Sequence, residues 1–218
     1  MESAFSEKRS ATFVLVHGSW HGGWCWRKLV PLLRAAGHEV YTPTLTGLGE
    51  RSHLIHPMID LTTHIQDIVA VLEYEDLHDV ILVGHSYAGM VIAGVAARVE
   101  SRLAQLVYLD AFMPEDGKAL KDYTDLPLEE LVREKGGGWR LTYEMLGSPP
   151  TRFGVEESEA LAWLIPRLRD QPFRTHSQPA QLPAGTGASL RQSYILLTDS
   201  WYFVEAASRA KRQGFAVH

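Results

Sequence analysis

Short apolar runs separated by polar turns recur along the chain. Four of them, at residues 12–17, 79–84, 105–110 and 193–198, are dominated by Val, Ile, Leu and aromatic residues. Such runs are typical of strands buried on both faces of a parallel sheet. A shorter run at residues 38–42 predicts another strand. Pro43, which follows directly, marks the end of this strand.

Between these predicted strands, apolar residues recur at the spacing of a helix. Leucines at residues 29–33 predict a helix that stops at Gly37, a residue suited to the left-handed position after a helix. Asp60 can cap a second helix, a third is rich in small residues over 88–97, and a fourth is expected at 203–212. The alternation indicates βαβ units, hence an α/β fold with a doubly wound, mostly parallel sheet.

The alternation breaks between residues 112 and 190. Glycines at 136–138 and prolines at 149–150 interrupt this stretch, and only residues 157–168 show helical spacing within it. We expect irregular chain that forms a lid insertion above the carboxyl ends of the strands, where α/β folds bind ligands. Residues 1–218 are then one domain that carries this insertion.

Composition and charge narrow the function classes. The chain has 218 residues and a net charge of −5, which argues against nucleic acid as a partner, because phosphate binding needs a basic surface. The polar start at residues 1–10 lacks a signal-peptide core, and no apolar run is long enough to cross a bilayer. One cysteine, Cys25, excludes an intrachain disulfide. These features predict a cytoplasmic protein with a small-molecule partner and no membrane contact.

The most specific motif is Gly84-His-Ser-Tyr-Ala-Gly89, between a predicted strand and a predicted helix. In a G-x-S-x-G elbow, small residues let the backbone turn sharply, so that the serine hydroxyl projects over the sheet. Ser86 is therefore the predicted nucleophile, and the Tyr87 N–H is a predicted oxyanion donor. Ala88 replaces the usual second glycine. The alternative is a tight turn with an ordinary N-cap serine.

A glycine-rich turn after the first strand is the second signal, at residues 17–24. It can direct the Ser19 N–H at the same oxyanion, and one such donor is typically worth about 3–4 kcal/mol of barrier. The alternative is a turn chosen only for its geometry. His17 and His21 are four residues apart, but glycines separate them and no acidic or thiol ligand is near, so we expect structural histidines and no metal. Phosphate-binding glycine motifs are absent, so no cofactor is expected.

Three segments carry a family resemblance: residues 13–26, 84–89 and 106–114. They resemble the plant methylesterase and hydroxynitrile-lyase group of α/β-hydrolases, and bacterial esterases similar to that group. The likeness is strong over residues 12–118, faint through the insertion and moderate again from Ser193 onward. The resemblance implies the α/β-hydrolase fold and an esterase-type site.

For individual residues, the resemblance implies Ser86 as nucleophile with Ser19 and Tyr87 as oxyanion donors. Lyases of the group tend to carry threonine directly after the first-strand histidine, where this chain has Gly18. This departure favours ester hydrolysis over cleavage of cyanohydrins.

Two aspartates are candidates for the acid of the catalytic triad, whose order in this fold is Ser, Asp or Glu, then His. Asp199 follows a late strand, where the resemblance places the acid, although one position early. Asp110 follows the preceding strand. We lean towards Asp199, and a turn-capping role remains the alternative for each.

No histidine in the sequence stands where the triad requires its base. The last predicted strand begins at residues 214–218, so His218 lies within it, and His176 precedes Asp199. We expect the base shortly downstream of residue 218. An incomplete last strand leaves an open sheet edge, which favours a homodimer or lowers stability.

The predicted function is a serine hydrolase, a carboxylesterase that cleaves a small, largely apolar ester through an acyl-enzyme. Its substrate-binding residues are expected to be Gly18, Trp20, Phe112 and Met113. The alternatives are a hydroxynitrile lyase-like enzyme and a catalytically silent protein that binds a small molecule in the same pocket.

Overall fold

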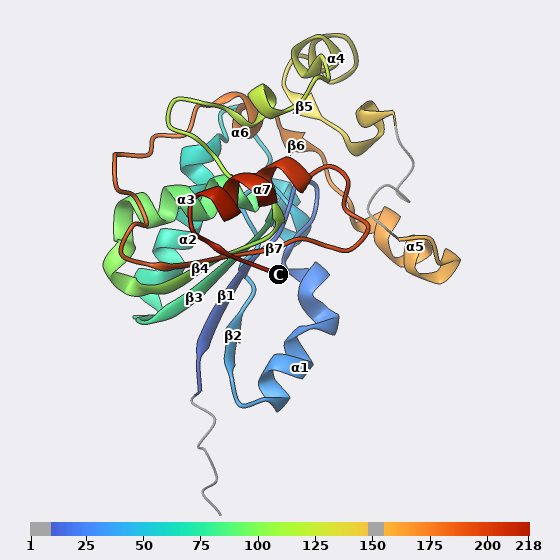
Figure 1. The fold of residues 1–218 in the computed structure, drawn as a ribbon. Coiled ribbons are helices and arrows are strands. Elements are labelled where there is room, and N and C mark those ends of the chain that lie inside the picture. Colours follow the sequence, from blue (N-terminus) through green and yellow to red (C-terminus); the bar gives the residue numbers. More distant parts are fainter. Residues whose placement is uncertain (1–9, 148–154) are drawn as a thin grey trace, which may run out of the picture.

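A computed structural model describes residues 10–147 and 155–218, and its centre is one six-stranded sheet (Figure 1). The strand order is β2-β1-β3-β4-β7-β8, and every pairing is parallel. This arrangement confirms the predicted doubly wound α/β sheet. The strands are β1 (Thr12–Val16), β2 (Glu39–Tyr41), β3 (Val80–Ser86), β4 (Leu103–Ala111), β7 (Arg191–Ile195) and β8 (Ala216–Val217).

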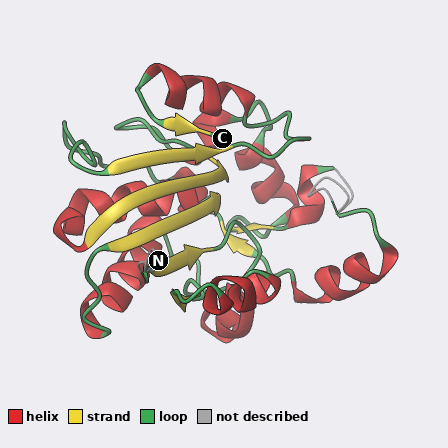
Figure 2. Cartoon of the chain, turned by 60° about the horizontal axis from the view of Figure 1, so that its bottom comes forward, coloured by secondary structure: helices red, strands yellow, loops and turns green. Residues whose placement is uncertain are grey.

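Helices cover both faces of the sheet (Figure 2). On one face, α2 (Leu61–Tyr74), α3 (Ala88–Val99) and α7 (Val204–Arg212) pack their apolar side chains against the strands. On the other face lie α1 (Val30–Ala35) and the 3-10 turn Gly23–Lys28. All four predicted helices are present.

Local signals explain where these helices begin and end. The Asp60 carboxylate accepts a hydrogen bond from the Thr63 N–H at 2.9 Å, and the Thr63 side chain caps the Asp60 N–H in return. This capping box fixes the first turn of α2. After α1, Gly37 has a φ of +91°, the left-handed conformation expected of a residue that ends a helix.

The segment 112–190 is more regular than the sequence predicts. It contains α4 (Leu128–Lys135), α5 (Ser158–Leu164) and α6 (Arg174–Ser177), and an antiparallel pair of short strands, β5 (Arg140–Leu141) and β6 (Gln171–Pro172). Of these elements, α4, α5 and β5 share an apolar cluster with Trp20. The helix expected within residues 157–168 is present as α5. The expectation of irregular chain was wrong for α4, α6 and the strand pair, because elements this short carry too few residues for a period to show.

Parts of the earlier predictions fall outside the described residues. The proline pair at 149–150 lies in the gap, and of the polar start only Ser10 is described. The extent of the domain, and a lid role for residues 112–190, stay predictions.

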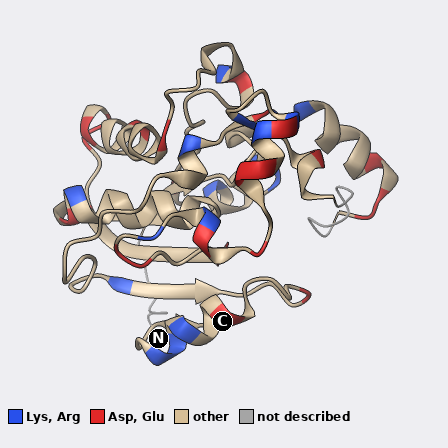
Figure 3. Ribbon diagram, turned by 90° about the horizontal axis from the view of Figure 1, so that it is seen from above, with Lys and Arg blue, Asp and Glu red and all other residues tan. Residues whose placement is uncertain are grey.

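Basic and acidic residues both occur along the outer parts of the chain (Figure 3). Basic and acidic segments alternate on the outer helices and loops, whereas the central strands are largely uncharged (Figure 3). Within the described ranges, no helix combines the length and hydropathy that a bilayer span requires.

Candidate active site

The carboxyl ends of β1, β3 and β4 meet at one edge of the sheet, and Ser86 lies at its centre. The register pairs Val16 with Gly84 and Ser86 with Ala111. The turn after β1 therefore lies on one side of Ser86, and the end of β4 lies on the other.

Ser86 occupies a strained elbow, as the sequence predicts. Its φ is +54°, in the left-handed region that non-glycine residues rarely adopt. A Cβ on Gly84 would lie 2.7 Å from the Ala88 carbonyl oxygen, and a Cβ on Gly89 would lie 1.8 Å from the Phe112 carbonyl oxygen. Any larger residue at position 84 or 89 would therefore clash with the backbone. The methyl group of Ala88, by contrast, fits in the buried interior.

Two backbone amides beside Ser86 have no acceptor among the residues that the structure describes. A Cβ on Gly18 would lie 3.0 Å from the Ser86 Cβ, so the turn after β1 touches the elbow. Ser19, the next residue, and Tyr87, the residue after the serine, are both buried. Across the described residues, neither N–H donates to a protein group. Buried donors without a partner are rare, and here they flank a candidate nucleophile.

Asp110 is the acidic residue that the fold brings to this edge. It is the extra residue where the register of β3 and β4 shifts, and its φ is +44°. Its side chain is buried and accepts hydrogen bonds from the Ser200 side chain and the Leu197 N–H, the latter at 3.3 Å. Burial raises the pKa of Asp110, and these two hydrogen bonds oppose the rise. Asp199, by contrast, is exposed in the turn after β7.

The contacts of the histidines next to the site indicate structural roles. The ring of His17 is wholly buried, with Nδ1 2.8 Å from the Gly18 carbonyl oxygen and Nε2 accepting from the Leu45 N–H at 3.1 Å. Burial lowers the pKa of His17 to about 3 and that of His85 to about 4, so both rings are neutral. Nδ1 of His21 lies 2.6 Å from the Ser19 carbonyl oxygen.

None of the ten histidines forms a hydrogen bond with the Ser86 hydroxyl in the described part of the chain. His218 is exposed, and its backbone pairs with β7. The described residues also hold no group of three or more His, Cys, Asp or Glu side chains arranged to bind a metal.

Sequence reasoning missed a buried polar network behind the two free amides. Nε2 of His176, from α6, lies 3.0 Å from the Ser19 hydroxyl. Its ring stacks on that of Tyr87, with centroids 5.0 Å apart and an interplanar angle of 8°. The Tyr87 hydroxyl in turn lies 2.9 Å from Nδ1 of His64. No local pattern signals this network, because its members lie on four different segments.

Trp20, a predicted substrate contact, mainly anchors the segment 112–190. Its ring is buried, and its indole N–H donates to the Leu141 carbonyl oxygen at 2.8 Å. Its backbone N–H donates to the Gln171 side chain at 3.1 Å. Trp20 therefore links the turn after β1 to both strands of the small sheet.

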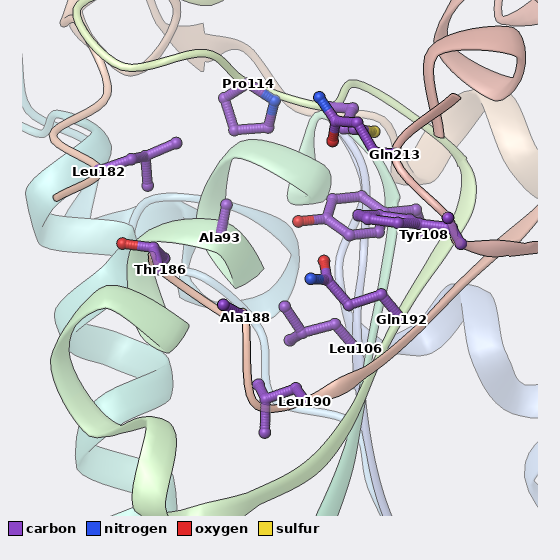
Figure 4. A pocket seen from close by; sticks show the side chains of 13 residues that line it. Ala93, Leu106, Tyr108, Pro114, Leu182, Thr186, Ala188, Leu190, Gln192 and Gln213 are labelled. Carbon is purple, nitrogen blue, oxygen red and sulfur yellow. The ribbon is translucent and has the colours of Figure 1, made fainter. Parts of the chain in front are cut away.

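Phe112 and Met113 follow β4 and have different neighbours. The Phe112 N–H donates to the Ser86 carbonyl oxygen at 3.1 Å, which keeps this residue at the elbow. Met113 instead lines a cavity of about 480 Å³ between α3, β4 and the loop before β7 (Figure 4). Tyr108 and Gln192 also line this cavity, but Ser86 does not. A substrate role for Met113 stays a prediction that this position does not support.

Comparisons with known proteins agree with the fold. The model of the alpha/beta hydrolase family matches residues 13–217. A carbendazim hydrolyzing esterase of Nocardioides sp. (strain SG-4G) is 44% identical over 198 residues, which are 88% of this chain and 81% of that protein.

A plant enzyme and a solved structure are also similar to this chain. Methylesterase 1 of Arabidopsis thaliana is 38% identical over 120 residues, which are 50% of this chain and 42% of that protein, so the match spans less than half of the plant enzyme. Among solved structures, an extracellular alpha/beta-hydrolase from a Paenibacillus species superimposes with a TM-score of 0.81 at 26% identity, over 95% of this chain and 88% of that one.

Proposed function

Because the chain belongs to the alpha/beta hydrolase family, we propose that it hydrolyses small, largely apolar carboxylic esters through an acyl-enzyme on Ser86. Similar proteins named as esterases and methylesterases favour ester hydrolysis over the lyase and the silent binding protein. The resemblance seen in the sequence is thereby confirmed at the level of the family.

The proposed reaction has two steps. Oγ of Ser86 attacks the ester carbonyl carbon as a histidine takes its proton, and the carbonyl oxygen becomes an oxyanion. The intermediate then collapses, the ester bond breaks, and the alcohol leaves with the proton from the histidinium. Water attacks the acyl-enzyme in the same way and releases the carboxylic acid.

The observation that carries the proposal is the strained serine beside two unpartnered, buried amides. The N–H groups of Ser19 and Tyr87 lack a protein acceptor in the described structure, and an oxyanion at Ser86 supplies one. Preorganised donors of this kind stabilise the transition state without having to reorient during the reaction.

We assign the triad acid to Asp110, in place of the sequence-based preference for Asp199. The burial of Asp110, its hydrogen bonds and its position beside the elbow support this choice. Asp110 also keeps the order of Ser, Asp and His along the chain. Among the described residues no histidine forms a hydrogen bond with the Ser86 side chain, so this assignment covers the acid alone.

The relatives suggest a starting panel of substrates. One is named for carbendazim and others for methyl esters, so carbendazim and methyl esters of small aromatic acids are the first compounds to test. Gly18, Trp20 and Phe112 are the proposed pocket residues. A cytoplasmic location and a homodimer also remain proposals, which cell fractionation and light scattering test.

The experiment compares the wild type with Ser86→Ala on this panel and on p-nitrophenyl acetate. We expect kcat to fall by at least about a thousandfold, because loss of a triad nucleophile can cost about a millionfold. Ser189→Ala is the matched control, since Ser189 is exposed and, among the described residues, hydrogen-bonds to Glu100 alone. Full activity in Ser86→Ala contradicts the proposal. Cyanide release from cyanohydrins without ester hydrolysis indicates the lyase instead.

A further inference from the structure

One buried histidine, His176, contacts both residues that carry the proposed oxyanion donors. It reaches them from α6, across 157 positions of sequence from Ser19. Its Nε2 lies 3.0 Å from the Ser19 hydroxyl, and its ring lies flat on the ring of Tyr87. No other described side chain is recorded in contact with both residues in this way.

The hydrogen bonds around His176 are consistent with one tautomer. The Thr175 hydroxyl lies 2.7 Å from the Pro172 carbonyl oxygen, to which it donates, and it accepts from the Gln171 side chain at 2.8 Å. In this arrangement Thr175 also accepts from Nδ1 of His176 across 2.9 Å, which places the ring proton on Nδ1. Nε2 then has a free lone pair, which accepts the hydrogen of the Ser19 hydroxyl.

Three neighbours fix the Tyr87 side chain, and one of them is Thr175, which hydrogen-bonds with its hydroxyl. His176 stacks on its ring, and His64 bonds its hydroxyl at 2.9 Å. Since Tyr87 directly follows Ser86, a fixed side chain restricts the direction of the backbone N–H that follows the nucleophile. The Ser19 side chain is held by the same histidine, which restricts the other donor.

We propose that His176 is a positioning residue for the oxyanion hole, holding Ser19 through its hydroxyl and Tyr87 through its ring. The inference rests on the proposed function, because it concerns the geometry of that same site. His176 does not touch the substrate. It transmits the rigidity of α6 and its neighbours to two amides that must point at one oxygen atom.

The charge state of His176 is consistent with this role. Burial, with a smaller effect from His64, lowers its pKa to about 3. The ring is therefore neutral between pH 5 and 8, and Nε2 remains an acceptor over that range. A neutral ring this deeply buried also lacks the basicity to take a proton from a serine.

The test is a double-mutant cycle with Ser19→Ala and His176→Phe. Phenylalanine keeps a ring on Tyr87 but removes the acceptor, and alanine removes the donor while its N–H stays. We expect each variant to lower kcat by about ten- to a hundredfold with a small change in KM, since misplacement by about 1 Å can cost a hundredfold. Because both remove one bond, the double variant should be no slower than the slower single variant.

Two further variants complete the design. His176→Gln keeps an acceptor and should recover part of the lost kcat. Gln178→Leu is the matched control: it breaks two hydrogen bonds between the same segment and Thr62 of α2, without touching Ser19 or Tyr87. Its kcat should stay within about twofold of the wild type. If His176→Phe does not fold, His176→Gln and Ser19→Ala carry the test.

The outcomes separate the two proposals. An unchanged kcat in Ser19→Ala and in the folded His176 variants overturns the positioning role, as do independent, multiplying effects of the two changes. If the wild type itself neither hydrolyses the esters nor reacts with a serine-directed probe, the proposed function fails and the inference fails with it.

Discussion

Acid sensitivity offers a quantitative test of the buried histidine network. Replacement of His176 by phenylalanine removes a ring whose pKa falls from its ordinary value of 6.5 to about 3 on folding. Between these values the unfolded chain binds a proton that the folded chain does not. The free energy of unfolding therefore falls as pH falls below 6.5, and it rises as pH rises through this window.

The magnitude follows from the two pKa values. At pH 7 the penalty from this one ring is only about 0.2 kcal/mol, whereas at pH 5 it reaches about 2 kcal/mol. His17 and His85, with pKa values of about 3 and about 4, are subject to the same effect. Together the three rings lower the stability at pH 5 by about 6 kcal/mol, which is comparable to the total stability of a typical domain.

The assay is urea unfolding of the wild type and His176→Phe at pH 7 and pH 5. The loss of free energy on acidification should be about 2 kcal/mol smaller in His176→Phe than in the wild type. Thr175→Val is the control, because it removes a buried neighbour in the same network but no titrating group. Its offset from the wild type should be the same at both pH values. An equal pH dependence in the wild type and His176→Phe would show that folding does not lower the pKa of His176.

The geometry around Ser86, at the carboxyl edge of the sheet, gives three further predictions. Gly89→Ala should lower stability by about 3 kcal/mol in thermal unfolding, since the new Cβ would lie 1.8 Å from a backbone carbonyl oxygen; an unchanged melting temperature contradicts the packing. Asp110→Asn should lower kcat by about a thousandfold or more and Asp199→Asn by less than about threefold, and the reverse ranking would restore Asp199 as the acid. Gly18→Thr should lower kcat/KM by more than about tenfold, because the Cβ of the new side chain would lie 3.0 Å from the Cβ of Ser86. Wild-type kinetics in this variant would show that the turn after β1 can move without disturbing Ser86.

The elbow could be predicted from sequence because its determinants are local. Strand, small residue, serine and helix follow one another within residues 80–99, so one motif specifies the backbone. The parallel sheet was predictable for the same reason, since each buried strand is a continuous apolar run.

The proposed acid and the buried network were not predictable, because they depend on contacts between distant segments. Asp110 and Asp199 both follow strands, and only the bulge of β4 and the burial it creates distinguish them. His176 gains its role from a contact with Ser19, 157 positions away. The short elements around it are held by tertiary packing rather than by their own periodicity.

We propose that Ser86 is a nucleophile that faces an oxyanion hole. The most direct measurement treats the protein with a fluorophosphonate and locates the adduct by peptide mass spectrometry. The account predicts one adduct, on Ser86, that is absent from Ser86→Ala. An adduct on a different residue, or none in the folded wild-type protein, would contradict it.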